Sequence, residues 1–174
     1  MAVSTLVATA GASNANAYCT LSVANQYHED RPAAGTTWAD ATNDEKIQAI
    51  IWATKLLDAL YDWNGWVTTE DQALLWPRTG MWYRSGYYID TDVIPTDLQH
   101  ATAEFARQLL ATDRAGDSDI ETQGITSLKA GPVALTFKDS VMAKVVPDAV
   151  FHLIPDQWGT PRGRARSTIE LERA

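Results

Sequence analysis

The sequence predicts a mainly α-helical fold: a small helical bundle with a short β-hairpin and an extended C-terminal tail. Three observations predict it. Two long stretches carry apolar residues at helical spacing, a later stretch alternates apolar and polar residues, and an arginine-rich stretch follows Trp158. The 174 residues suit one compact domain with a single core, and 45% apolar with 21% charged residues is a globular composition.

The strongest helix prediction covers residues 42–63. Thr42 or Asn43 can cap its first turn, where Asp44 and Glu45 are favourable. The apolar positions form a wide stripe that Trp52 and Leu56 broaden: Ile47, Ile50, Ile51, Leu57, Leu60 and Tyr61. A helix that is apolar around so much of its girth is expected to be buried against two neighbours or against another chain.

The other expected elements follow in chain order. We expect a strand over 4–9, a helix from Thr20 or Ser22 to the RPAAG stretch, and a short helix from Thr69 to Leu75. Further elements are a helix over 96–114, a polar linker over 115–124, two strands within 124–139 and a short helix from Pro147.

These elements divide the chain into three parts. Residues 1–122 form a helical domain that contains an aromatic loop at 80–94, and residues 123–158 form the hairpin and a short closing helix. Residues 159–174 form a flexible basic tail, for which the alternative is an unstructured end without a role.

The stretch ALLWPRTG, residues 73–80, raises the question of a site. Pro77 fixes its own φ and favours an extended Trp76, so a helical turn ends here. Trp76 is a wedge that the core would bury, although it also suits a contact surface. Arg78 either contacts another chain or caps helix carbonyls internally.

The net charge of −8 is unevenly distributed. Residues 1–158 contain 10 Lys+Arg and 20 Asp+Glu, whereas residues 159–174 contain 4 and 2. An acidic body is unsuited to binding phosphates, which leaves the tail as the basic segment.

Catalytic motifs are missing from the sequence. It has no phosphate-binding loop, dinucleotide fingerprint or nucleophile elbow, and His28, His100 and His152 are not paired at metal-ligand spacing. Cys19 is the only cysteine, and the DTD stretch at 90–92 lacks the rest of a calcium loop. We therefore expect no catalytic residue, metal or cofactor, and a protein that is not an enzyme. We also expect no export signal and no membrane span.

The aromatic segment 76–88 is the candidate binding surface. Its members are Trp76, Arg78, Trp82, Tyr83, Arg84, Tyr87 and Tyr88. Aromatic rings beside arginines can stack bases, but a site for about six phosphates needs about as many clustered cations. Two arginines in an acidic body favour contact with protein, where Trp, Tyr and Arg dominate the binding energy.

Several motifs together resemble one family of phage proteins. They are ANAYCTLSVANQYHEDRP (15–32), Trp38, DEKIQAIIWATKLLD (44–58), WNGW (63–66), QALLWPRTG (72–80), GYYIDTDVIP (86–95) and ATAEFARQLL (101–110). In this order and spacing they resemble the head-to-tail connectors, also called adaptors or head-completion proteins, of long-tailed bacteriophages. Some members carry the label "DnaT-like single-stranded DNA-binding". The resemblance covers about residues 4–112, with a weaker counterpart at 123–155.

The resemblance implies a structural protein of the virion, made in the host cytoplasm and placed at the head–tail junction. Its copies would form a ring of about twelve beneath the portal protein and extend the DNA channel. A tail-side stopper or tail terminator protein would dock below, and genomic DNA would pass without specific binding. For the tail we expect portal docking through Trp158, Arg162, Arg164 and Arg166.

Two other functions stay open. One is a single-stranded-DNA-binding accessory protein of DNA replication, which would need a basic groove that this acidic body does not predict. The other is a cytosolic helical adaptor unrelated to phage, which the ordered set of motifs disfavours.

Overall fold

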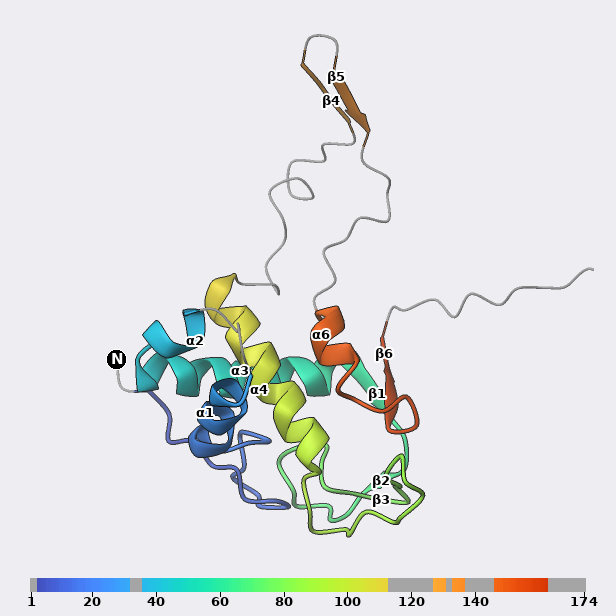
Figure 1. Cartoon of the computed structure of the whole chain (residues 1–174). Helices are drawn as coiled ribbons and strands as arrows, with labels where there is room; N and C mark the ends of the chain where they lie inside the picture. The colour runs from blue at the N-terminus through green and yellow to red at the C-terminus, as the bar shows by residue number, and fades with distance from the viewer. Residues whose placement is uncertain (1–2, 32–35, 113–126, 131–132, 137–145, 163–174) are drawn as a thin grey trace, which may run out of the picture.

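The structure, a computed structural model (Figure 1), describes residues 3–31, 36–112, 127–130, 133–136 and 146–162. The fold is mainly α-helical with short antiparallel strand pairs, as the sequence predicts. Its helices are α1 (Leu21–Glu29), α2 (Thr37–Asp40), α3 (Asn43–Leu60), α4 (Thr96–Ala111) and α6 (Asp148–Phe151).

Helix α4 is the centre of the bundle. It contacts α1, α2, α3 and α6, and Figure 1 shows it crossing α3. Its buried side chains run through the middle of the helix: Leu98, Ala101, Thr102, Ala103, Glu104, Phe105 and Ala106. Small alanines among them allow close approach of the neighbouring helices, because each shortens the distance between packed backbones.

Helix α3 begins and ends near the predicted residues. The Thr42 side chain accepts from the Glu45 backbone N–H, and the Glu45 carboxylate accepts from the Thr42 backbone N–H in return. This reciprocal capping box satisfies two N–H groups that a helix leaves free. Helix α1 begins after Thr20, whose side chain accepts from Val23, so the expected start is also confirmed.

The strands form three antiparallel pairs in the described chain. β1 (Tyr61–Trp63) pairs with β6 (Gly159–Pro161), and β2 (Trp66–Val67) pairs with β3 (Arg78–Thr79). β4 (Ser127–Ala130) pairs with β5 (Val133–Thr136), which confirms the predicted hairpin in that region. The short helix predicted at Pro147 is α6, for which Pro147 is the N-cap.

Two predicted elements are wrong. Residues 4–9 form no strand, because the Asn16 side chain accepts from Val7 N–H and donates to Thr5 O in place of a strand partner. Residues 69–75 form no helix. There the Gln72 side chain accepts from the backbone of Thr68 and Thr69 and donates to Leu74 and Pro77, so it organises an irregular loop.

The β1–β6 pair also changes the expected boundary of the tail. Residues 159–161 belong to a strand of the body, and Trp158 is fully buried. The pairing was missed because strand partners from opposite parts of the sequence leave no local signal. Of the expected basic tail, residues 163–174 lie outside the described residues, as does the whole of the predicted linker at 115–124.

Candidate functional site

Exposed aromatic side chains gather in one part of the chain. Among the described residues, the exposed large apolar side chains other than Trp52 all lie between residues 66 and 93. Trp66 is 73% exposed, Trp82 53% and Tyr88 42%. These three residues are called here the aromatic surface. Because these rings are so open on an otherwise well-packed chain, the aromatic surface is the candidate interaction site.

Direct contacts join the members of the aromatic surface. Trp66 pairs with Thr79 across β2 and β3, and its ring lies over Gly80, 3.7 Å from where a Cβ would be. The Tyr88 hydroxyl accepts from the Gly80 backbone N–H at 3.1 Å. Tyr88 also packs edge-on against Trp82, with ring centroids 5.1 Å apart. Trp66 and Tyr88 therefore meet at Gly80, and Trp82 packs against Tyr88.

Trp82 and Tyr88 face each other across a hairpin. They form an antiparallel bridge, and Tyr83 N–H donates to Tyr87 O at 2.8 Å. Gly86 completes the turn with a φ of +85°, which favours glycine. This confirms the predicted hairpin-like loop around Ser85-Gly86. Tyr87, at its tip, is 76% exposed.

Arg78 fixes the backbone beneath the aromatic surface. Its guanidinium donates to the carbonyls of Asn64 at 2.6 Å, Gly65 at 2.8 Å and Leu75 at 2.9 Å. Arg78 is buried, and this burial lowers the pKa of its guanidinium. The nearby Tyr18 and Asp58 act in the opposite direction and raise it. Of the two roles that the sequence allows for Arg78, the structure shows the internal one, although the carbonyls belong to loops rather than to a helix end.

Trp76 is likewise internal. It is fully buried, follows the loop organised by Gln72, and precedes a cis peptide bond to Pro77. Its ring contacts both Trp63 and Trp158, so several rings pack in sequence under the hairpin. Trp76 and Arg78 therefore support the aromatic surface from below and do not form part of it.

A partly buried carboxylate holds the same loop to the bundle. Asp58, near the end of α3, accepts from the Tyr18 hydroxyl and from the Leu75 backbone N–H. Burial raises the pKa of Asp58, and burial together with Asp58 raises the pKa of Tyr18 well above its usual value. The hydroxyl proton therefore stays on Tyr18 as the donor.

The C-terminal part of the described chain is attached to the hairpin. The Trp158 indole N–H donates to Trp82 O at 2.7 Å, and the Gln157 side-chain amide donates to the same oxygen at 3.0 Å. Tyr83 is half-buried and packs against Trp158. Trp158 thus belongs to the core, which corrects its assignment to a docking tail.

The remaining predicted residues are divided between surface and undescribed chain. Arg84 is exposed and its guanidinium lies 3.4 Å from His152 O. Arg162 is exposed and donates to the Asp62 carboxylate at 2.7 Å. Arg164 and Arg166 lie outside the described residues. Sequence reasoning left Trp66 out of the candidate site, because the Asn64-Gly65-Trp66 stretch is typical of a break between elements.

The charges around the aromatic surface are mainly negative. Between residues 66 and 93 the acidic side chains of Glu70, Asp71, Asp90 and Asp92 are exposed, whereas Arg84 is the exposed cation of that segment. The electrostatics disfavour a phosphate backbone and favour an apolar or cationic partner.

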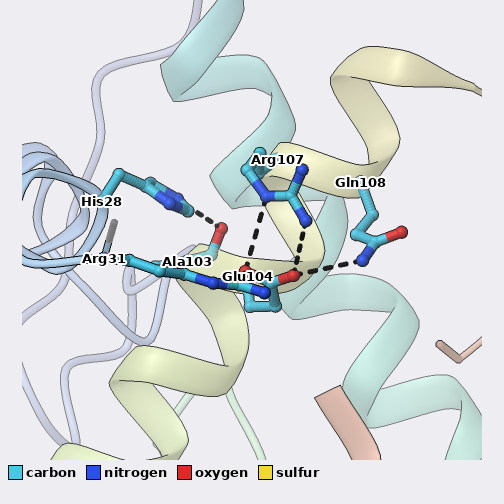
Figure 2. Close-up of polar contacts among 6 residues, drawn as sticks. All are labelled: His28, Arg31, Ala103, Glu104, Arg107 and Gln108. Atoms are coloured by element: carbon cyan, nitrogen blue, oxygen red, sulfur yellow. Dashed lines mark hydrogen bonds and ion pairs between the residues drawn. The ribbon is translucent and has the colours of Figure 1, made fainter. Parts of the chain in front are cut away.

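A second polar cluster is internal (Figure 2). Glu104 of α4 is completely buried and accepts from Arg31, from Arg107 at 2.7 Å and from the Gln108 amide at 3.1 Å. His28 lies beside it, with Nε2 3.0 Å from Ala103 O, so this nitrogen carries the proton. The cluster links the end of α1 to α4 and is explained by their packing.

A hollow of about 570 Å³ lies next to this cluster, between α1 and the first turns of α4. Its lining mixes apolar and polar side chains: Val23, Gln26, Tyr27, Asp30, Arg31, Thr96, Gln99 and His100. Arg31, its cation, is already paired with Glu104. The other charged side chain of the lining is Asp30, so the charges there have opposite signs.

Within the described ranges no group of three or more His, Cys, Asp or Glu side chains is placed to hold a metal ion. Across the same residues no helix is both long and apolar enough to cross a membrane. Cys19 is buried, and burial raises the pKa of its thiol to about 12.

Comparison with known proteins identifies the family. A family model described as "Putative DnaT-like ssDNA binding protein" matches residues 5–174. The chain belongs to this family. No curated protein and no solved structure matches the chain. The DnaT-like label is thus shown for nearly the whole chain, including the C-terminal residues for which the sequence motifs offered no counterpart.

Proposed function

We propose that the chain is a structural assembly protein, a head-to-tail adaptor of a long-tailed bacteriophage that contacts its neighbours through the aromatic surface. The observation that carries the proposal is the exposure of Trp66, Trp82 and Tyr88 on a firmly supported base. Trp and Tyr contribute most of the energy at protein interfaces, and a preorganised surface loses little entropy on binding.

In this proposal the copies form a ring of about twelve beneath the portal protein. A tail-side stopper or tail terminator protein docks below the ring, at the head–tail junction of the virion. The net charge of −8 suits a channel wall, because an acidic wall repels the phosphates of passing genomic DNA. The role is structural and needs neither a catalytic residue nor a cofactor.

The alternative is a single-stranded-DNA-binding accessory protein of DNA replication. The family description is compatible with it, and exposed Trp and Tyr rings can stack bases. Binding to single strands also uses a positively charged groove along the backbone. At the aromatic surface the exposed cation is Arg84, while Arg78 is buried, so the charges favour the protein partner.

A binding experiment with the double variant Trp66→Ala and Trp82→Ala distinguishes the adaptor function from single-stranded DNA binding. Both rings are largely exposed, so the variant should fold normally and yet fail to join portal rings in cosedimentation. The matched control is Trp52→Ala, which removes a 43% exposed ring on α3, away from the aromatic surface, and should join the rings as the original chain does.

Single-stranded oligonucleotides complete the experiment. The adaptor proposal expects negligible binding by the original chain at low and at moderate salt. Tight, steeply salt-dependent binding that the double variant loses, with no portal attachment by the original chain, would establish the alternative.

A further inference from the structure

The described chain ends at a defined place. In the antiparallel β1–β6 pair, Gly159 lies opposite Trp63 and Pro161 lies opposite Tyr61. Arg162 continues in that direction: its backbone N–H donates to Leu60 O at 2.7 Å, at the end of α3. Trp66 follows β1 at the opposite end. At Arg162 the chain is therefore directed away from its own aromatic surface, as Figure 1 also shows for β6.

The residues that follow have a distinct chemistry. GRARSTIELERA, residues 163–174, begins with Arg164 and Arg166 and has no acidic residue before Glu170. Guanidinium groups stack on the faces of Trp and Tyr rings, and such contacts strengthen where neighbouring carboxylates add attraction. The aromatic surface offers both: its rings are exposed, Asp90 acts electrostatically on Tyr88, and Asp92 is exposed two residues further along the chain.

We infer that the aromatic surface binds Arg164 and Arg166 from a second copy of this chain. The inference rests on the proposed function and names the occupant of its surface. Twelve residues span up to about 40 Å when extended, which suffices to reach an adjacent copy. A surface on one copy that takes a segment from the next is a heterologous contact, and repetition of such a contact closes a ring.

A peptide titration tests the contact directly. The receptor is the full chain with Arg164→Gln and Arg166→Gln, whose own segment cannot compete, and the probe is a synthetic peptide of residues 162–174. Calorimetry should detect binding that weakens at least tenfold when the peptide carries the same two glutamines. Adding Trp66→Ala and Trp82→Ala to the receptor should abolish it. A control peptide with Glu170→Gln and Glu172→Gln should bind at least as well as the original.

Equal binding of the original and the glutamine peptide, or binding that survives loss of both tryptophans, would overturn the inference. Displacement of the peptide by a single-stranded oligonucleotide at lower concentration would overturn it too, since the surface would then prefer nucleic acid.

A second measurement separates this inference from the proposed function. The full chain with Arg164→Gln and Arg166→Gln should lose ring assembly on portal, judged by cosedimentation. If that variant assembles normally, the inference fails and the adaptor function stands. If the original chain does not join portal at all, the adaptor function fails whatever the peptide does.

Discussion

The Trp158 indole N–H donates a 2.7 Å hydrogen bond to the backbone carbonyl of Trp82. This bond joins the last core residue before β6 to the hairpin around Ser85-Gly86. Because Trp158 also packs against Trp76, the same ring supports the WPRTG stretch from beneath. Residues from distant parts of the chain thus pack beneath the exposed rings.

The first prediction concerns Arg78. Arg78→Met keeps most of the apolar stem and removes the donors to the Asn64, Gly65 and Leu75 carbonyls. Carbonyls left without their donors destabilise the folded state. The free energy of unfolding should therefore fall by about 3 kcal/mol. Urea denaturation measures it. Arg84→Met, at an exposed arginine of the same hairpin region, is the control and should change it by no more than about 0.5 kcal/mol.

Gly65 provides a test of backbone packing. Its φ is +67°, and a Cβ there would lie 2.3 Å from Thr79 O. Gly86 has a similar φ of +85° with nothing within 4 Å of a Cβ. Gly86→Ala should therefore cost about 1 kcal/mol from conformation alone. Gly65→Ala should cost at least about 2 kcal/mol more, since β3 must shift. Equal melting temperatures for the two variants would contradict the β2–β3 arrangement.

The buried Glu104 is expected to be essential for stability. Glu104→Gln keeps the shape of the side chain but removes the charge that pairs with Arg31 and Arg107. Both arginines retain some solvent access, so the expected loss is about 2–3 kcal/mol, toward the lower end for a broken buried pair. Chemical denaturation provides the value. Glu29→Gln, at an exposed glutamate at the end of α1, should be nearly neutral, and a similarly small effect at Glu104 would refute the cluster's role.

His28 makes stability depend on pH. Burial lowers its pKa to about 4, and the nearby arginines add to this, against the opposing effects of Ala103 O and Glu104. The unfolded chain, with an ordinary pKa near 6.5, binds the proton first, so stability is complete above that value and falls as pH decreases toward 4. Thermal melts between pH 7 and about 5 measure this effect, because most carboxyl groups titrate below that pH range. His28→Gln should flatten the slope there, and an unchanged slope would assign it to other groups.

Cys19 should be inert in the folded protein. With a thiol pKa of about 12, roughly one molecule in 10⁴ is a thiolate at pH 8, and the side chain is 1% exposed. A chromogenic disulfide reagent should therefore label the chain only after denaturant unfolds it. Prompt labelling of the native protein would show that the N-terminal segment opens.

The long helices could be predicted because their signals are local. Thr42 with Glu45 marks the start of α3, and Pro95 precedes the first turn of α4. The hairpin at Ser85-Gly86 also has a local signal in its glycine. Strand 4–9 and helix 69–75 failed for a shared reason: one amide side chain, Asn16 or Gln72, takes over the backbone hydrogen bonds.

The sequence indicates the segment of the candidate site, but it does not distinguish the exposed residues of that segment from the buried ones. The segment 76–88 contains the exposed Trp82, Tyr87 and Tyr88, yet its Trp76 and Arg78 are buried, and the most exposed tryptophan, Trp66, lies outside it. Composition alone does not separate these roles, because cores and interfaces use the same residues. The exposure of each ring depends on β1–β6 and β2–β3, whose partners lie far apart in sequence.

The proposed function requires that the chain assembles with protein and does not bind DNA. The most direct measurement is light scattering of the full chain alone and after addition of portal rings, with a single-stranded oligonucleotide in parallel, at two salt concentrations. We expect a defined number of copies to join each portal ring, and no change in mass with the oligonucleotide. A mass increase with the oligonucleotide that disappears at higher salt, and no increase with portal, would contradict it.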